Sequence, residues 1–148
     1  MTTFSSSNQN HELVSRIYEA INKRDFQVLD DIIAADYQSR DPRCPEEDKG
    51  PKVARRIATI LTSAAPDLTY TIESIETEDN GSVRVAYTLR GTHSGEVMGI
   101  PASGHEIEIS GVSYSRVAEG KIVETTSTVG ALDVIQALAG DPTIKNCP

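Results

Sequence analysis

Two serines placed symmetrically about a turn are the first residues in this sequence that could do chemistry. Ser113 and Ser127 flank Glu119-Gly120, and a hairpin there would set the two hydroxyls opposite each other or one residue apart. As hydroxyls they could donate hydrogen bonds to a carbonyl or an enolate without acting as a base. Alternatively, they are only small polar strand residues. No Gly-x-Ser-x-Gly elbow or Ser-His-acid arrangement indicates a nucleophilic serine.

A second candidate is the guanidinium of Arg40, which ends a short extended stretch before Asp41-Pro42. If Arg40 faces a cavity, its planar fork could bind a carboxylate, a phosphate or an enolate oxygen. Asp41 would then alternate to the opposite face, where we expect it to cap a turn rather than act as a base. The alternative for Arg40 is an exposed side chain paired with one of the acidic residues that follow, Glu46, Glu47 or Asp48.

His93 is a third candidate, because an imidazole can exchange protons near neutral pH. It ends a predicted strand in the run Gly-Thr-His-Ser-Gly. It could be the titrating group of a site, and a structural role in hydrogen-bonding the loop from Ser94 to Gly104 fits its position equally well. The candidate catalytic residues are therefore Arg40, His93, Ser113 and Ser127.

Four larger side chains are candidates for the wall of a substrate pocket. Tyr18 and Tyr87 lie on apolar stripes, which favours a place in the core or in a pocket wall over a role in proton transfer. Met98 and Ile100 lie in a glycine-rich loop, where they could form a hydrophobic rim or cover one end of the fold. We predict that all four contact the substrate.

The elements that must position these residues begin with helices. Apolar residues recur at helical spacing in three segments of the first half of the chain. The third of these begins at Gly50-Pro51, where proline suits the first turn of a helix. We expect a loose tail over residues 1–9, helices over residues 10–23, 26–33 and 51–63, and a short extended stretch over residues 36–40.

After Ala65-Pro66-Asp67 the apolar period changes from helical to alternating, which indicates strands. Asp79-Asn80-Gly81 is typical of a hairpin turn. Helices followed by strands predict a single α+β domain over residues 10–140, with the helices on one face of an antiparallel sheet and a loose tail over residues 141–148. We expect strands over residues 68–72, 83–89, 106–117 and 121–129, and a closing helix over residues 131–138.

The totals exclude several classes of protein. A chain of 148 residues can form one domain with its own core, and a net charge of −8 opposes binding to nucleic acid. No apolar run approaches 18 residues and the first ten lack a signal-peptide pattern, so we expect a cytoplasmic protein that does not bind membranes. Cys44, Cys147 and the three histidines are dispersed, which predicts two free thiols, no disulfide and no metal site.

The run Arg-Gly-Thr-His-Ser-Gly-Glu-Val-Met-Gly-Ile-Pro-Ala-Ser-Gly over residues 90–104 resembles the SnoaL-like polyketide cyclases of the nuclear transport factor 2-like superfamily. The likeness includes residues 37–42, 65–68 and 116–124. It implies a cone-shaped sheet wrapped around a pocket, a cyclic or cyclisable carbonyl substrate, no metal or organic cofactor, and homodimers packed through the sheet. The face expected at the dimer interface carries Val83, Val85, Tyr87 and Leu89.

The chain departs from this family where the family has its acid/base. There, Lys-Ile-Val-Glu usually continues into His-Trp-Asp, but here the three places read Thr125, Thr126 and Ser127. The usual His or Asp partner on the preceding strand is matched by Ser113, and a frequent histidine is matched by Arg40. A hydroxyl cannot accept an α-proton as a carboxylate does. Without that carboxylate, we expect Arg40 to bind an oxyanion of the ligand.

The sequence therefore predicts a cofactor-independent cyclase or isomerase that acts on a polyketide-like or other oxygenated hydrophobic substrate. The missing carboxylate keeps open a non-catalytic carrier or sensor of small ligands. A dimeric interaction module is a third alternative, because a fold alone does not decide function.

Overall fold

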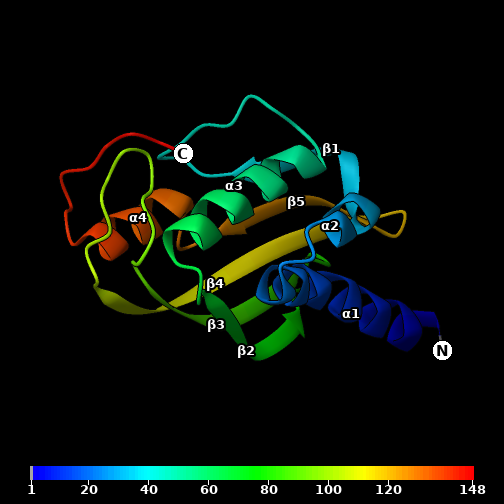
Figure 1. The fold of residues 1–148 in the computed structure, drawn as a ribbon. Helices are drawn as coiled ribbons and strands as arrows, with labels where there is room; N and C mark the ends of the chain where they lie inside the picture. Colours follow the sequence, from blue (N-terminus) through cyan, green and yellow to red (C-terminus); the bar gives the residue numbers. More distant parts are fainter. Residues whose placement is uncertain (1) are drawn as a thin grey trace.

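A computed structural model describes residues 2–148, with their side chains from residue 8 onward (Figure 1). Helices precede most of the strands, so the predicted α+β class is confirmed. The helices are α1 (Thr2–Lys23), α2 (Gln27–Ile32), α3 (Pro51–Ala64) and α4 (Ala131–Ala139). The strands are β1 (Ile33–Arg40), β2 (Thr69–Thr77), β3 (Val83–Thr92), β4 (Glu106–Ala118) and β5 (Lys121–Ser127).

The five strands form one sheet in the order β1-β5-β4-β3-β2. Strands β2 to β5 pair antiparallel, but β1 runs parallel to β5. The sheet is therefore mixed, and the prediction of an antiparallel sheet was wrong at this edge. Parallel neighbours need a long connection between them, and here that connection includes α3 and three further strands.

Both predicted hairpin turns are present. Gly81 has a φ of 87° in the first turn, and the Glu78 N–H donates to the Ser82 carbonyl at 2.7 Å. In the second turn, Glu119 and Gly120 both have positive φ, at 52° and 73°. Two consecutive positive φ values match the twist of the flanking strands. The turn is flanked by the pairs Ala118–Lys121 and Val117–Ile122, and a register shift between Arg116 and Val117 offsets the following pairs of β4 and β5 by one residue.

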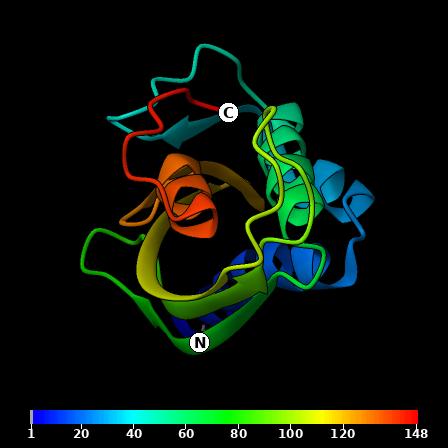
Figure 2. The same ribbon diagram turned by 60° about the vertical axis from the view of Figure 1, so that its left-hand side comes forward.

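The inner face of the sheet packs against helices to form the core. The alternating residues of β3 that suggested a dimer interface, Val83, Val85, Tyr87 and Leu89, are all buried inside the chain. They are therefore not available as an outer face, and that argument for a dimer was wrong. Figure 2 shows β4 bending around α4, which lies on the same side of the sheet as α3.

Two features near the ends of the chain were not predicted. Helix α1 begins at Thr2 rather than at residue 10, because a helix that has formed can extend at little cost into a polar segment. Near the other end, Cys147 forms a disulfide with Cys44 across a sequence separation of 103 residues. The prediction of two free thiols was wrong, because the fold brings their Cα atoms to 5.7 Å.

The C-terminal segment also makes contacts besides the disulfide. The Gln136 side chain donates to the carbonyls of Pro142 and Ile144, at 3.2 and 2.7 Å. In Figures 1 and 2 this segment runs beside the loop between β1 and α3. None of the helices described over residues 2–148 is long and apolar enough to cross a membrane.

Candidate functional site

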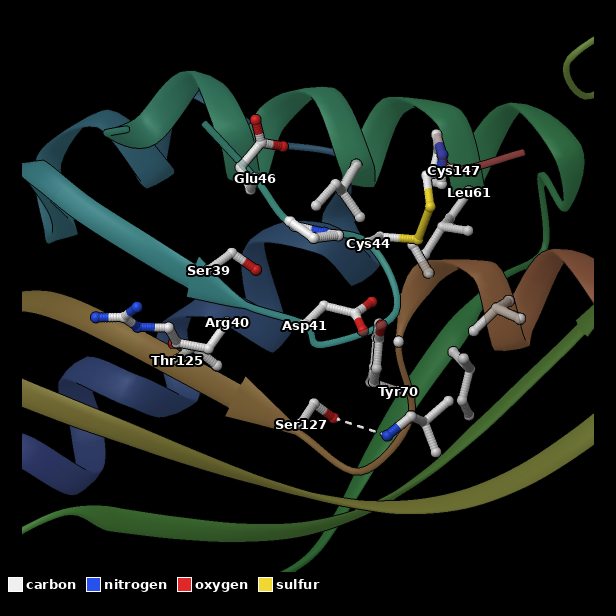
Figure 3. A pocket seen from close by; sticks show the side chains of 18 of the residues that line it. Ser39, Arg40, Asp41, Cys44, Glu46, Leu61, Tyr70, Thr125, Ser127 and Cys147 are labelled. Atoms are coloured by element: carbon white, nitrogen blue, oxygen red, sulfur yellow. Dashed lines mark hydrogen bonds between the residues drawn. A yellow bond between two sulfur atoms is a disulfide. The ribbon is translucent and has the colours of Figure 1, made fainter. Parts of the chain in front are cut away.

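A cavity lies between the inner face of the sheet and the helices, in two adjoining compartments of about 160 and 150 Å³ (Figure 3). The first opens toward the β1–α3 loop and is bordered by the Cys44–Cys147 disulfide. The second reaches inward to α1. The residues that line both compartments are Ser39, Ile57, Leu61, Tyr70, Tyr87, Thr125, Ser127 and Val129.

Three tyrosines from three elements meet in the inner compartment. Tyr18 of α1 lies with its ring centroid 5.2 Å from that of Tyr70 and 5.8 Å from that of Tyr87. Tyr70 of β2 and Tyr87 of β3 are diagonal neighbours across the two strands, with centroids 5.3 Å apart. These separations suit edge-to-face aromatic contacts. The cluster forms an aromatic wall, as the sequence predicted for Tyr18 and Tyr87.

Two serine hydroxyls each bond to one of these tyrosines. Ser113 and Ser127 are direct partners in the β4–β5 ladder, so of the two arrangements predicted across the turn the opposed one is present. Ser113 is buried and shares a hydrogen bond with the Tyr18 hydroxyl, and Ser127 shares one with the Tyr87 hydroxyl at 2.8 Å. The structure therefore places these four predicted site residues around one cavity, whose outer compartment Arg40 also borders.

The Tyr70 hydroxyl differs from its two neighbours. It has no hydrogen-bond partner among the side chains and backbone groups that the structure describes, although its ring borders both compartments. A phenol donates a hydrogen bond readily. The Tyr70 hydroxyl is thus free to bond to a ligand, and the sequence analysis missed it because Tyr70 looked like any alternating strand residue.

Burial raises the pKa of all the tyrosines that face this interior. It is the main cause for Tyr18, Tyr37, Tyr70 and Tyr87, and hydrogen bonds oppose it at Tyr18, Tyr37 and Tyr87. The charged phenolate is costly in a poorly solvated site. These hydroxyls are therefore held protonated as hydrogen-bond donors, and none is suited to act as a base at neutral pH.

We expect this burial to be visible in an alkaline titration. The four buried phenols should stay protonated above pH 10, near which phenols in the unfolded chain ionise. Above pH 10 the unfolded chain binds fewer protons than the folded one, so the free energy of unfolding should fall as pH rises. Below pH 10 these groups are protonated in both states and should not make the free energy of unfolding depend on pH. Phenolate absorbance, compared with that in guanidinium chloride, measures this. Ionisation of all five tyrosines in the folded protein would contradict it.

Arg40 borders the outer compartment, but its guanidinium is paired with a carboxylate of the protein rather than left free for a ligand as predicted. Its side chain is 57% exposed, and its Nε donates to the Glu124 carboxylate at 2.7 Å. Figure 3 shows the guanidinium pointing away from Asp41. The error was one of alternation, because the buried Tyr37 puts Ser39 and Asp41 on the inner side of β1 and Arg40 on the outer side.

Asp41 follows β1 and lines the outer compartment. As predicted, it caps a turn, since its Oδ1 accepts the Arg43 N–H at 3.0 Å. Its Oδ2 lies against Gly130, where an added Cβ would come within 2.4 Å of it. The cavity is lined by one other side-chain carboxylate, that of Glu46, which is paired with Arg56.

The remaining predicted residues lie outside the cavity. His93 is fully buried, and its Nδ1 accepts the Ser103 N–H at 3.1 Å, so it holds the loop over residues 94–104. Its Nε2 has no hydrogen-bond partner in the described part of the chain. Met98 is 43% exposed in that loop, and Ile100 packs against the core. None of these three lines either compartment.

No cluster of metal ligands accompanies the cavity. Over the described residues, His, Cys, Asp and Glu side chains form no group of three or more that could hold a metal ion. The polar side chains along the cavity are mainly hydroxyl groups, with the charged side chains of Arg40, Asp41 and Glu46 bordering the outer compartment. An apolar cavity with a few convergent polar groups is typical of a small-molecule site.

Comparisons with known proteins show the family to which this small-molecule-binding fold belongs. The SnoaL-like polyketide cyclase profile matches residues 11–138. The chain therefore belongs to the SnoaL-like polyketide cyclase family. It is 30% identical over 115 residues to the aklanonic acid methyl ester cyclase of Streptomyces peucetius, which covers 75% of this chain and 77% of that enzyme.

Solved structures share the fold. A SnoaL-like polyketide cyclase structure from Jannaschia superposes with a TM-score of 0.72 at 22% identity, covering 92% of this chain and 95% of the other. The structure of IdmH from Streptomyces antibioticus, described as a polyketide cyclase, has a TM-score of 0.67 at 27% identity, with 86% and 96% covered. The arrangement of helices and sheet is thus that of the family.

Proposed function

We propose that this protein catalyses a cofactor-independent cyclisation or isomerisation of a polyketide-like, oxygenated substrate held in the cavity. The observation that carries the proposal is the wall shared by the two compartments, where Tyr70, Tyr87 and Ser127 present rings and hydroxyls together. The proposal includes that the sheet is cone-shaped, as the family resemblance implies, and that it encloses the substrate. The Streptomyces peucetius relative, named for an ester that it cyclises, supports this substrate class.

The cavity wall suits the binding of a planar substrate that carries carbonyl groups. The rings of Tyr18, Tyr70 and Tyr87 offer apolar faces and edges against which an aromatic system can pack. Hydroxyl groups that remain protonated can donate to a carbonyl oxygen as it becomes an enolate oxygen. Because the Tyr70 hydroxyl has no partner among the described residues, it needs no bond to be broken before it donates.

The family's acid/base position remains part of the proposal. By resemblance, Ser127 stands where the cyclases carry an aspartate. Its hydroxyl bonds with Tyr87 and accepts the Val129 N–H at 3.3 Å, which makes it part of a donor network rather than a base. Any proton abstraction here requires a group from another element of the fold.

Replacing Tyr70 with phenylalanine tests the proposal. We expect Tyr70→Phe to lower kcat for cyclisation of aklanonic acid methyl ester by about 100-fold, the typical effect of removing one donor to an oxyanion. Product is separated from substrate by chromatography. Tyr114→Phe, which removes the same hydroxyl from an exposed residue of β4, is the matched control and should retain full activity.

If the parent protein does not convert the ester, the proposed function is wrong. If both variants convert the ester with the same kcat as the parent, the role of Tyr70 is wrong. Binding of the ester without turnover would favour a carrier or sensor. One observation favours that second function. Ser113 and Ser127, which pair across β4 and β5, carry hydroxyl groups, and hydroxyl groups are not bases.

Homodimer formation and a cytoplasmic location stay predictions. The dimer now depends on the family resemblance alone, since the β3 residues that suggested it are buried within one chain. The Cys44–Cys147 disulfide argues against a strongly reducing compartment, in which protein thiols are normally kept reduced.

A further inference from the structure

Asp41 combines three features that no other side chain along this cavity shares. It carries a carboxylate, it lines the outer compartment, and it forms no ion pair with any residue that the structure describes. The nearest arginines in sequence are engaged elsewhere, Arg40 with Glu124 and Arg43 with Asp133. The other carboxylate along the cavity, on Glu46, is paired with Arg56. Asp41 is therefore the group available to accept a proton.

The local backbone holds one oxygen of Asp41 and leaves the other free. Oδ1 accepts the Arg43 N–H at 3.0 Å, which fixes the side chain on the inner side of the turn. Oδ2 lies above Gly130, the residue before α4, and any side chain at position 130 would collide with it. Figure 3 shows the carboxylate between the end of β1 and the start of α4.

We propose that Asp41 is the general base of this cavity, with Oδ2 removing a proton from the carbon next to a carbonyl group of the substrate. This inference deepens the proposed function and rests on it. The proposed base lies at the end of β1. The position on β5 that matches the aspartate of the family holds the hydroxyl of Ser127 in this chain. A positioned general base contributes roughly 10²- to 10⁴-fold to a rate.

The step balances without a cofactor. The proton passes from the substrate carbon to Oδ2, the electron pair of the C–H bond becomes the enolate double bond, and the carbonyl oxygen takes the negative charge. Tyr70 donates a hydrogen bond to that oxygen. The enolate carbon then attacks a second carbonyl to form the ring, and the new alkoxide takes the proton back from Asp41. The product is an isomer of the substrate.

Proton exchange tests the base separately from ring closure. The probe is 1-tetralone, an aromatic ring fused to a cyclic ketone, incubated with the full chain in D₂O. Mass spectrometry counts deuterium at the carbon next to the carbonyl. We expect the parent protein to accelerate exchange and Asp41→Asn to lower the protein-dependent rate by at least about 100-fold. Glu47→Gln removes an exposed carboxylate from the same loop and should exchange within about twofold of the parent.

Asparagine keeps the turn intact, because its side-chain oxygen can accept the same Arg43 N–H. Circular dichroism should therefore show an unchanged fold. Binding of 1-tetralone, followed by tyrosine fluorescence in a chain that has no tryptophan, should also be unchanged. If Asp41 had only a structural role, Asp41→Asn would alter folding or the binding of 1-tetralone. Whatever 1-tetralone still bound to the variant would then exchange at the parental rate.

Gly130→Ala provides an independent geometric test. Its Cβ would force Oδ2 from its place, so exchange should fall roughly tenfold or more while the carboxylate is retained. In the Asp41→Asn background the same change should have little further effect, because effects that act through one group are not additive. Independent, additive losses would contradict a shared action at Oδ2.

The outcomes separate this inference from the proposed function. Exchange that requires Asp41 without cyclisation of aklanonic acid methyl ester supports the base and contradicts the cyclase. Cyclisation at the parental rate by Asp41→Asn supports the cyclase and overturns the base. Absence of exchange by the parent protein, or exchange by Asp41→Asn within about threefold of the parent, also overturns it.

Discussion

Replacing Cys44 and Cys147 together with serine is expected to lower the free energy of unfolding by about 2–4 kcal/mol. The disulfide closes a loop with a sequence separation of 103 residues, and long loops restrict the unfolded chain the most. It also ties the end of the chain to the outer compartment, which Cys44, Cys147 and Pro148 border. Denaturant unfolding under oxidising conditions measures the change.

Reduction supplies the control for this prediction. Dithiothreitol should destabilise the parent protein by the same amount as the double substitution and should have no effect on the double variant. Hydrogen exchange over residues 141–148 should rise in both reduced and substituted proteins. Two titratable thiols in the oxidised parent, or an unchanged unfolding midpoint after reduction, would contradict a stabilising disulfide.

Gly111→Ala should disrupt the cavity wall and lower stability by about 1–3 kcal/mol, the usual cost of overpacking a core. Gly111 pairs with Tyr87 across β3 and β4, and a Cβ there would lie 2.6 Å from the Tyr87 hydroxyl and 2.9 Å from a Val129 methyl. Tyr87 would have to move from between its aromatic neighbours, and its bond with Ser127 would be lost.

Thermal unfolding and ligand binding together check this second prediction. Ser110→Ala, at the exposed position that precedes Gly111 on β4, is the matched control and should change stability by less than about 0.5 kcal/mol. Binding of 1-tetralone should weaken in Gly111→Ala and not in the control. Equal stability and equal binding in both variants would show that Tyr87 does not need the space that glycine leaves.

The sequence by itself determined the order of the elements and the position of the turn in the second hairpin. Apolar period separates helix from strand, and Glu119-Gly120 marks the turn of the second hairpin. These local rules left Ser113 opposite Ser127 or one residue away from it, and the register shift between Arg116 and Val117 sets the direct pairing. Local rules could also have oriented β1. Had alternation been counted from Tyr37, the one aromatic residue of that strand, Asp41 would have been placed inward and Arg40 outward.

Only the tertiary structure decided which elements meet around the cavity. The contact between Tyr18 and Tyr70, the parallel pairing of β1 with β5, and the closeness of Asp41 to Gly130 join residues far apart in the chain. The Cys44–Cys147 disulfide does the same. None of these has a local signature, because each depends on how helices and strands pack as whole bodies, and that packing is set by the sum of many weak contacts rather than by any one stretch of sequence.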